Sequence, residues 1–297
     1  MGIFADEFGP LTALSQAAIY AAVAGVIGAL FCLWLLRFDS ARWLGNYLRA
    51  ASLLGLFATA LHFLLRVAAL GGEWGAMWDP VLFSIVRDSV LGDRSLVLLT
   101  GFAVALAGHL SLSRRQSALR RGGVLLLMLS VLLLLYSFGL SGHLVEAHWL
   151  ERLALRLHVL AMALWAGSLY PLLRQLNTSG ADLAPARHNL LRFSHLATGI
   201  VGLLLVCGLW LALTLLNWQT LPAELSKAGS YAQMLAVKIA LVALLLCLAA
   251  ANKWRLVPAL AERHRQMTLS VRGEVLLAAG ILLVTAALAG LLSPGAH

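Results

Sequence analysis

The chain contains 297 residues, of which 61% are hydrophobic and 12% are charged, and its formal net charge is +9. Soluble domains are about 45–50% apolar and about 25% charged, so the composition excludes an ordinary soluble protein and predicts a helical membrane protein. The basic residues lie in short loops between apolar runs rather than in a separate basic domain, and we therefore expect no nucleic-acid partner.

Eight apolar runs are long enough to cross a bilayer, whose core of roughly 30 Å needs about 20 helical residues. We predict spans at residues 11–36, 46–70, 93–112, 122–141, 150–173, 191–217, 231–251 and 273–292. The segment 74–91 is only moderately apolar and contains Arg87 and Asp88, which favours a short helix at the membrane interface over a ninth span. The predicted fold class is an all-α polytopic membrane protein that has the lipid bilayer as a partner.

Arginine and lysine residues gather in alternate loops and predict the orientation of the spans. They occur in the regions 37–49, 113–121, 174–192 and 253–272, whereas most acidic residues lie in the other loops. Because short loops rich in Lys and Arg stay in the cytoplasm, these four regions are expected to be cytoplasmic and both termini periplasmic.

Short similarities between the two halves of the chain indicate an internal duplication. The stretch YLRAASLLG opens the second predicted span and LLRFSHLATG opens the sixth, while LWLLRF resembles YPLLRQL at the ends of the first and fifth spans. Four spans per half give both halves the same topology. We therefore predict two parallel four-helix repeats, formed by residues 1–141 and 142–297.

Ionisable side chains lie inside or just outside the apolar runs, where burial of a charged group costs free energy. His143, His148 and His158 fall within one short stretch, between the fourth predicted span and the first half of the fifth. At 1.5 Å per residue, His158, His62 and Lys238 are expected about 10–12 Å below the outer surface. Such groups usually face a cavity or a bundle interior, so they are hypotheses for a functional site.

The fifth predicted span carries a soft metal-binding face. His158, Met162 and Trp165 follow the spacing i, i+4, i+7 and therefore lie on one side of a helix. Imidazole nitrogen and thioether sulfur together suit copper, Cu(I) especially. Ordinary alternatives are an interhelical hydrogen bond for His158 and for His62, packing for Met162, and a snorkelling side chain for Lys238.

Several motifs occur in a defined order along the second half. A small residue and Gly-His follow one span, then come H-x-x-x-x-x-x-W-x-G, a Phe-Ser pair, and a helix that ends in Asn-[RK]-x-[RK]-x-x-P. The residues concerned are Ser141, Gly142, His143, His158, Trp165, Gly167, Phe193, Ser194, Tyr231, Lys238, Asn252, Lys253, Arg255 and Pro258. In this order and spacing the chain resembles the bacterial copper resistance protein D family over about 141–292. It departs from the family pattern at His195, where Arg is frequent, and at Ala232, where Gly follows the Tyr.

The resemblance implies a protein of the bacterial cytoplasmic (inner) membrane that transports or handles copper, with a periplasmic copper-binding protein as partner. On this hypothesis copper ions are bound first at the periplasmic mouth and then within the membrane. The proposed metal ligands are His143, His148, His158, His62 and Met162. The proposed supporting residues are Lys238, Arg66, Trp165 and Tyr231.

Two other functions stay open at this point. His62 and His158 could ligate one b-type haem axially and carry electrons across the membrane. Alternatively, the chain could bind copper as a subunit that does not transport it. We do not expect an enzyme, because the sequence contains no GxxxxGK[ST], HExxH or GxSxG motif.

Overall fold

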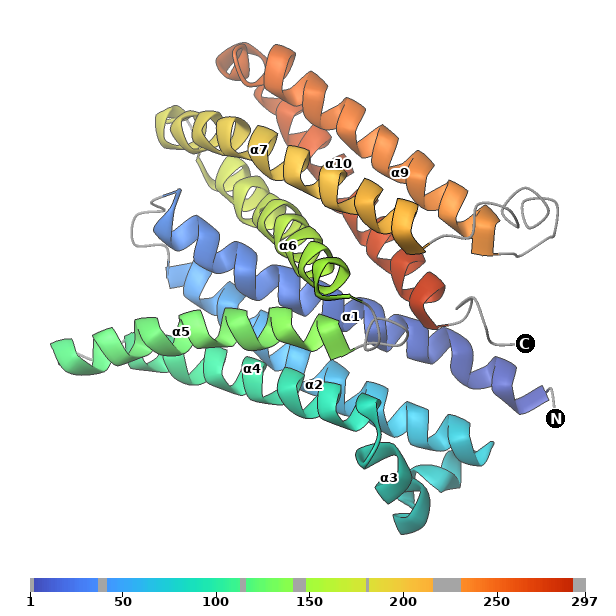
Figure 1. Ribbon diagram of the computed structural model, residues 1–297. Coiled ribbons are helices and arrows are strands. Elements are labelled where there is room, and N and C mark those ends of the chain that lie inside the picture. Colours follow the sequence, from blue (N-terminus) through green and yellow to red (C-terminus); the bar gives the residue numbers. More distant parts are fainter. Residues whose placement is uncertain are drawn as a thin grey trace.

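A computed structural model describes residues 3–36, 42–112, 116–140, 148–179, 182–215 and 231–290, and every regular element in these ranges is a helix (Figure 1). The long helices are α1 (Ile3–Trp34), α2 (Arg42–Gly71), α4 (Val90–Leu112), α5 (Ser117–Ser137), α6 (Trp149–Thr178), α7 (Ala184–Leu215), α9 (Tyr231–Ala251) and α10 (Leu260–Gly290). Each of the eight is long and apolar enough, in the described residues, to cross a membrane. The predicted all-α fold with eight spans is confirmed.

The segment between α2 and α4 is not a span. It forms the 3-10 helix η1 (Trp74–Trp78) and the two-turn helix α3 (Pro80–Arg87). Asp79 caps α3, because its Oδ1 accepts hydrogen bonds from the backbone N–H groups of Val81 at 2.8 Å and Leu82 at 3.2 Å. A short capped helix therefore occupies the region predicted to lie at the interface.

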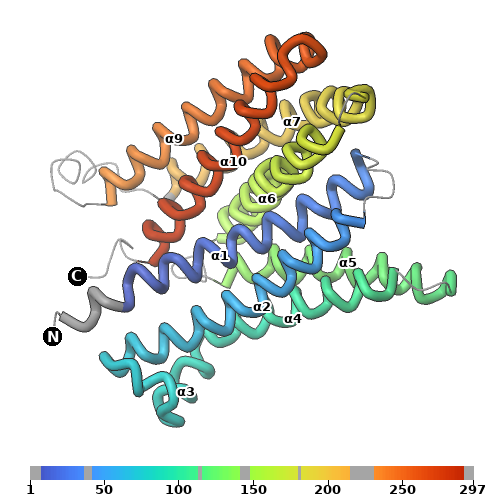
Figure 2. Tube along the Cα trace, turned by 180° about the vertical axis from the view of Figure 1, so that it is seen from behind, coloured from blue at the N-terminus to red at the C-terminus, as the bar shows by residue number. Residues whose placement is uncertain are grey.

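Helix α1 lies at the centre of the bundle, between the group α2, α4, α5 and the group α6, α7, α9, α10 (Figures 1 and 2). It packs against α2, α6 and α10. Ala22, Val23, Val26 and Ala29 on this helix have no exposed surface. One hydrophobic cluster runs through α1 and joins residues from both halves of the chain.

Small residues allow α1 and α6 to approach until their backbones touch. A Cβ atom built on Gly167 would lie only 1.9 Å from the carbonyl oxygen of Ala24, and one built on Gly28 would lie 2.2 Å from the carbonyl carbon of Gly167. The Tyr47 hydroxyl donates a hydrogen bond of 3.2 Å to the Gly167 carbonyl at the same crossing. Only glycine fits at these positions, as in other close crossings of membrane helices.

The two halves pack differently in one respect. Helix α2 packs on α4, whereas α7 and α9, the pair that the predicted repeat would match to them, do not pack closely along their described lengths. Instead α7 packs on α6, and α9 packs on α10. The parallel repeat thus stays a prediction, and the wider spacing of α7 and α9 leaves room for the cavity described below.

Several helices begin earlier than the predicted spans, α7 and α10 among them. Helix α7 starts at Ala184 rather than at residue 191, and α10 starts at Leu260 rather than at residue 273. The additional turns contain good helix formers such as Ala, Leu, Arg and Glu, which continue the helix although they are too polar to register as an apolar run. The start of α1 and the end of α10 lie at the same end of the bundle (Figure 1), and which membrane side this end faces stays a prediction.

Candidate functional site

The outermost predicted ligands lie near the start of α6. His143 falls outside the described residues. His148 is exposed and caps α6, because its Nδ1 accepts a hydrogen bond of 3.4 Å from the backbone N–H of Leu150. Its ring centroid lies 5.8 Å from that of Trp149. Nε2 of His148 takes no part in this capping hydrogen bond.

His158 is half-buried in the contact between α6 and α7. Its Nδ1 lies 3.0 Å from the carbonyl oxygen of Leu204. A carbonyl oxygen only accepts, so Nδ1 carries the hydrogen and Nε2 of the neutral ring has a free electron pair. A Cβ atom on Gly208 would lie 3.0 Å from Cε1 of His158, so this glycine provides the space for the ring. Metal-bound histidines are commonly oriented by such a backbone hydrogen bond.

The neighbours of His158 continue along the same face of α6. Met162 is one turn away, half-buried and packed against the main hydrophobic cluster. Trp165 is 5% exposed and lies two turns away, about 10 Å along the helix axis. Lys238 of α9 is the charged group that acts electrostatically on His158, and Tyr231 is the first residue of α9.

His62 belongs to another part of the bundle. It is 9% exposed on α2, and its Nδ1 is 2.9 Å from the hydroxyl of Ser15 on α1. The cations that act on it are Arg94 and the exposed Arg66. The structure therefore gives His62 a hydrogen bond between α1 and α2, separate from the contact that His158 makes between α6 and α7.

The predicted ligands do not form one compact cluster. Among the described residues, no three His, Cys, Asp or Glu side chains gather in a way that could hold a metal ion. His148 and His158 are ten residues apart, about 15 Å along α6. The described residues therefore show no single metal centre with three or more His, Cys, Asp or Glu ligands.

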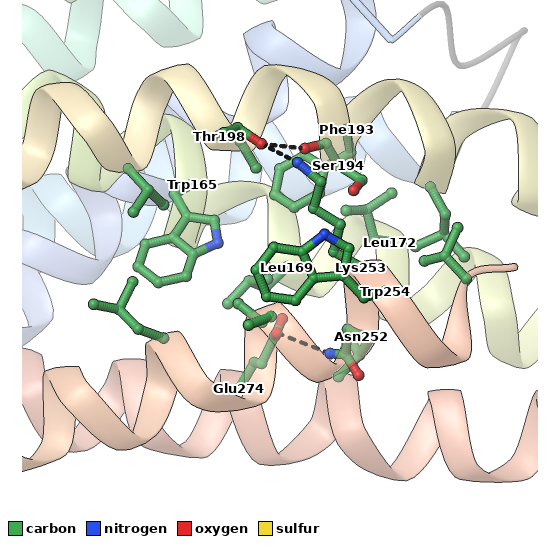
Figure 3. Close-up of a pocket in the computed structure, with 18 of the residues that line it drawn as sticks. Trp165, Leu169, Leu172, Phe193, Ser194, Thr198, Asn252, Lys253, Trp254 and Glu274 are labelled. Carbon is green, nitrogen blue, oxygen red and sulfur yellow. Dashed lines mark hydrogen bonds between the residues drawn. The ribbon is translucent and has the colours of Figure 1, made fainter.

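A cavity of about 250 Å³ lies beyond Trp165, between α6, α7, α9 and α10 (Figure 3). Most of its wall is apolar. Its polar side chains come from α7, α10 and the π-helix η4 (Asn252–Leu256), which follows α9. They are Ser194, Thr198, Asn252, Lys253 and Glu274.

Two hydrogen-bonded pairs face this cavity from opposite sides (Figure 3). The Lys253 ammonium donates to the Thr198 hydroxyl at 2.5 Å, and this hydroxyl donates to the Ser194 carbonyl at 3.1 Å. On the other side, Nδ2 of Asn252 donates to Oε1 of Glu274 at 2.8 Å. Asn252 and Glu274 are only 5% and 4% exposed.

The local sequence explains why Asn252 and Lys253 lie at this place. The backbone N–H of Val257 bonds to the carbonyl of Asn252 at 2.9 Å, five residues earlier, which is the spacing of a π-helix. Pro258 follows and has no N–H with which to continue the ladder. Widened turns of this kind are often found at functional sites.

Glu274 is the charged residue of this cavity that the sequence did not reveal. The predicted span began at residue 273, which placed Glu274 at a membrane surface, where an acid needs no explanation. In the structure Glu274 lies fourteen residues beyond the first residue of α10, Leu260. A search for acids inside longer helices would have found it.

One comparison with known proteins covers this part of the chain. Residues 187–288 match the family model described as copper resistance protein D. This segment is therefore similar to that family. It contains α9, η4 and most of α7 and α10, and so it includes Ser194, Thr198, Asn252, Lys253 and Glu274 of the cavity.

The predicted family resemblance is confirmed for this segment. The copper resistance protein D match does not extend to His143, His148, His158 or Trp165, which precede it. No curated protein and no solved structure matched the chain. The chain is therefore a multi-pass membrane protein whose second half contains a segment similar to the copper resistance protein D family.

Proposed function

We propose that this protein transports copper across the bacterial cytoplasmic membrane and has no catalytic activity of its own. The observation that carries the proposal is the position of His158. Its free Nε2 lies inside an apolar span, and Met162 and Trp165 lead from it along one helix face to the cavity shown in Figure 3. Nitrogen and thioether ligands in this order suit copper better than hard cations.

Copper is the cargo in this proposal and passes between weak sites. A periplasmic copper-binding protein delivers the ion to His148 and His143 at the periplasmic mouth. The ion then moves to His158 and Met162, and from there past Trp165 into the cavity. Sites with few ligands bind weakly enough to release the ion, which a transport path requires.

The decisive experiment measures copper uptake into proteoliposomes. Replacing His158 with Ala removes the ligand inside the membrane, and we expect the initial uptake rate to fall at least tenfold. His188→Ala is the matched control, because His188 is exposed at the start of α7 and belongs to neither the mouth nor the cavity. Equal rates for wild type and His158→Ala would overturn the proposed path.

A second measurement separates transport from binding alone. Copper content after equilibrium dialysis reports binding, and the uptake rate reports flux. A wild-type protein that retains copper but produces no uptake above that of empty liposomes would be a copper-binding subunit and would contradict the transport proposal.

A further inference from the structure

The carboxyl group of Glu274 is held in an unusual place for an acid. It is 4% exposed, lies in the interior of a membrane-spanning helix and lines the cavity. No Lys, Arg or His in the described part of the chain forms an ion pair with it. Burial of an unpaired carboxylate is costly, so a group of this kind inside a membrane calls for a partner or a proton.

The hydrogen-bond partner of Glu274 is the neutral side chain of Asn252. Its Nδ2 donates to Oε1 of Glu274 at 2.8 Å, and its Oδ1 points away from the carboxyl group (Figure 3). An amide has no charge with which to balance a carboxylate. Because no cation pairs with this buried group, a bound proton is the remaining way to avoid an isolated charge.

We propose that Glu274 is protonated and accepts the hydrogen bond of Asn252, and that copper entering the cavity displaces this proton. In the pair, Nδ2–H of Asn252 bonds to Oε1 of Glu274. The proton removes the charge of a carboxyl group that has no cationic partner, as burial in an apolar place requires. The first part stands on the structure alone, and the displacement by copper rests on the proposed function.

The other charges around the cavity explain why copper would displace the proton. Lys253 is the one charged side chain besides Glu274 among the cavity's described wall residues, and its ammonium bonds to Thr198. The walls from α6 and α7 carry no acid or base. The side chain of the nearby Arg272 bonds to Oδ1 of Asn177, and α1, which packs on α10, has no Lys, Arg, Asp or Glu between Phe8 and Trp34.

A copper ion arriving in this apolar space adds positive charge beside Lys253. When the O–H bond of Glu274 breaks, the proton leaves for the water on the side from which copper arrived, and the carboxylate remains. After copper leaves on the other side, a proton taken from that side restores the O–H bond. Loss of one proton for each Cu(I) ion keeps the charge of the cavity constant and avoids the cost of an unbalanced charge in a low dielectric. The coupling thus predicts an electroneutral exchange of copper for protons.

The protonated pair is tested without copper by infrared difference spectroscopy of the purified protein. We expect the carbonyl band of a protonated carboxylic acid at neutral pH, shifted in D2O and lost in Glu274→Gln. The side-chain oxygen of Gln can accept the same hydrogen bond from Asn252, so this variant should fold normally. Glu262→Gln, at an exposed acid of the same helix, should leave the band unchanged. Asn252→Ala should shift the band rather than remove it.

Absence of this band in the wild type overturns the whole proposal, whatever the protein transports. The exchange is tested in proteoliposomes with a pH-sensitive dye inside and the membrane potential clamped at zero. Addition of copper outside should raise the luminal pH for the wild type and not for Glu274→Gln. If the infrared band is present and copper enters but the luminal pH does not change, the exchange of copper for protons is overturned. If the wild type shows no copper uptake, both the proposed function and the exchange are contradicted, and only the protonation of Glu274 remains supported.

Discussion

The ammonium group of Lys253 donates a hydrogen bond of 2.5 Å to the hydroxyl group of Thr198 and so connects η4 to α7 across the cavity. Because α7 and α9 do not pack closely along their described lengths, this contact links α7 to the segment that follows α9, at the predicted cytoplasmic end. Its removal should loosen one wall of the cavity.

Thr198→Val removes the hydroxyl group with little change in side-chain volume. A hydrogen bond of this kind contributes about 1 kcal/mol, so the free energy of unfolding should fall by about that amount. Thermal unfolding in detergent measures the change. Thr198→Ser keeps the hydroxyl and should remain close to wild type, and equal stability of the Val variant and the wild type would show that the contact contributes nothing.

Lys238→Gln should strengthen copper binding at His158. The ammonium group of Lys238 acts electrostatically on this histidine, and it should therefore repel a cation bound there. Removal of a nearby like charge in a partly buried place should lower the copper Kd about three- to tenfold. Competition titration with a copper chelator measures this Kd. Arg255→Gln, at an exposed cation on η4, should leave it unchanged, and weaker binding by the Lys238 variant would contradict the assignment.

Gly167→Ala should destabilise the bundle, because its Cβ atom would lie 1.9 Å from the carbonyl oxygen of Ala24. Overpacking of this kind costs about 1–3 kcal/mol, and here the obstacle is backbone rather than a movable side chain. Gly199 is the control, since a Cβ atom there meets nothing within 4 Å. Gly199→Ala should be neutral or stabilising by about 0.5–1 kcal/mol. Thermal unfolding of both variants checks the prediction.

The purified protein is expected to contain copper after loading and to show no haem absorption. A haem held by His62 and His158 needs the two rings on opposite sides of one plane. In the structure His62 bonds to α1 and His158 to α7. Metal analysis with an absorbance spectrum measures the outcome. A Soret band that disappears in His62→Ala would replace the copper proposal with electron transfer.

The eight spans could be predicted because each is an apolar run of membrane length, a property that needs no knowledge of neighbouring helices. The ends of the helices could not be predicted in this way. Helix α10 continues through thirteen residues before the predicted start of its span, and hydropathy does not distinguish a polar helical turn from a loop. Because the predicted span began too late, Glu274 was not recognised as a residue in the interior of a helix.

The depth of His62 and of His158 in the membrane could also be estimated, since it depends only on the rise per residue. The residues that His62 and His158 contact could not be predicted from the sequence. Whether two residues at similar depth face one another depends on the order of the helices, and α1 lies between α2 and α6 (Figure 2). The contacts of His62 with Ser15 and of His158 with Leu204 follow from that order.

The central position of α1 has a consequence for biogenesis. Helix α1 leaves the ribosome long before α6 and α10 exist, yet both form part of its cover. Until α10 is inserted, the small-residue face of α1 must be shielded by lipid or by the insertion machinery. Chains truncated before α10 should therefore remain associated with that machinery and be degraded, and the bundle around α1 should be complete only after α10 has been synthesised.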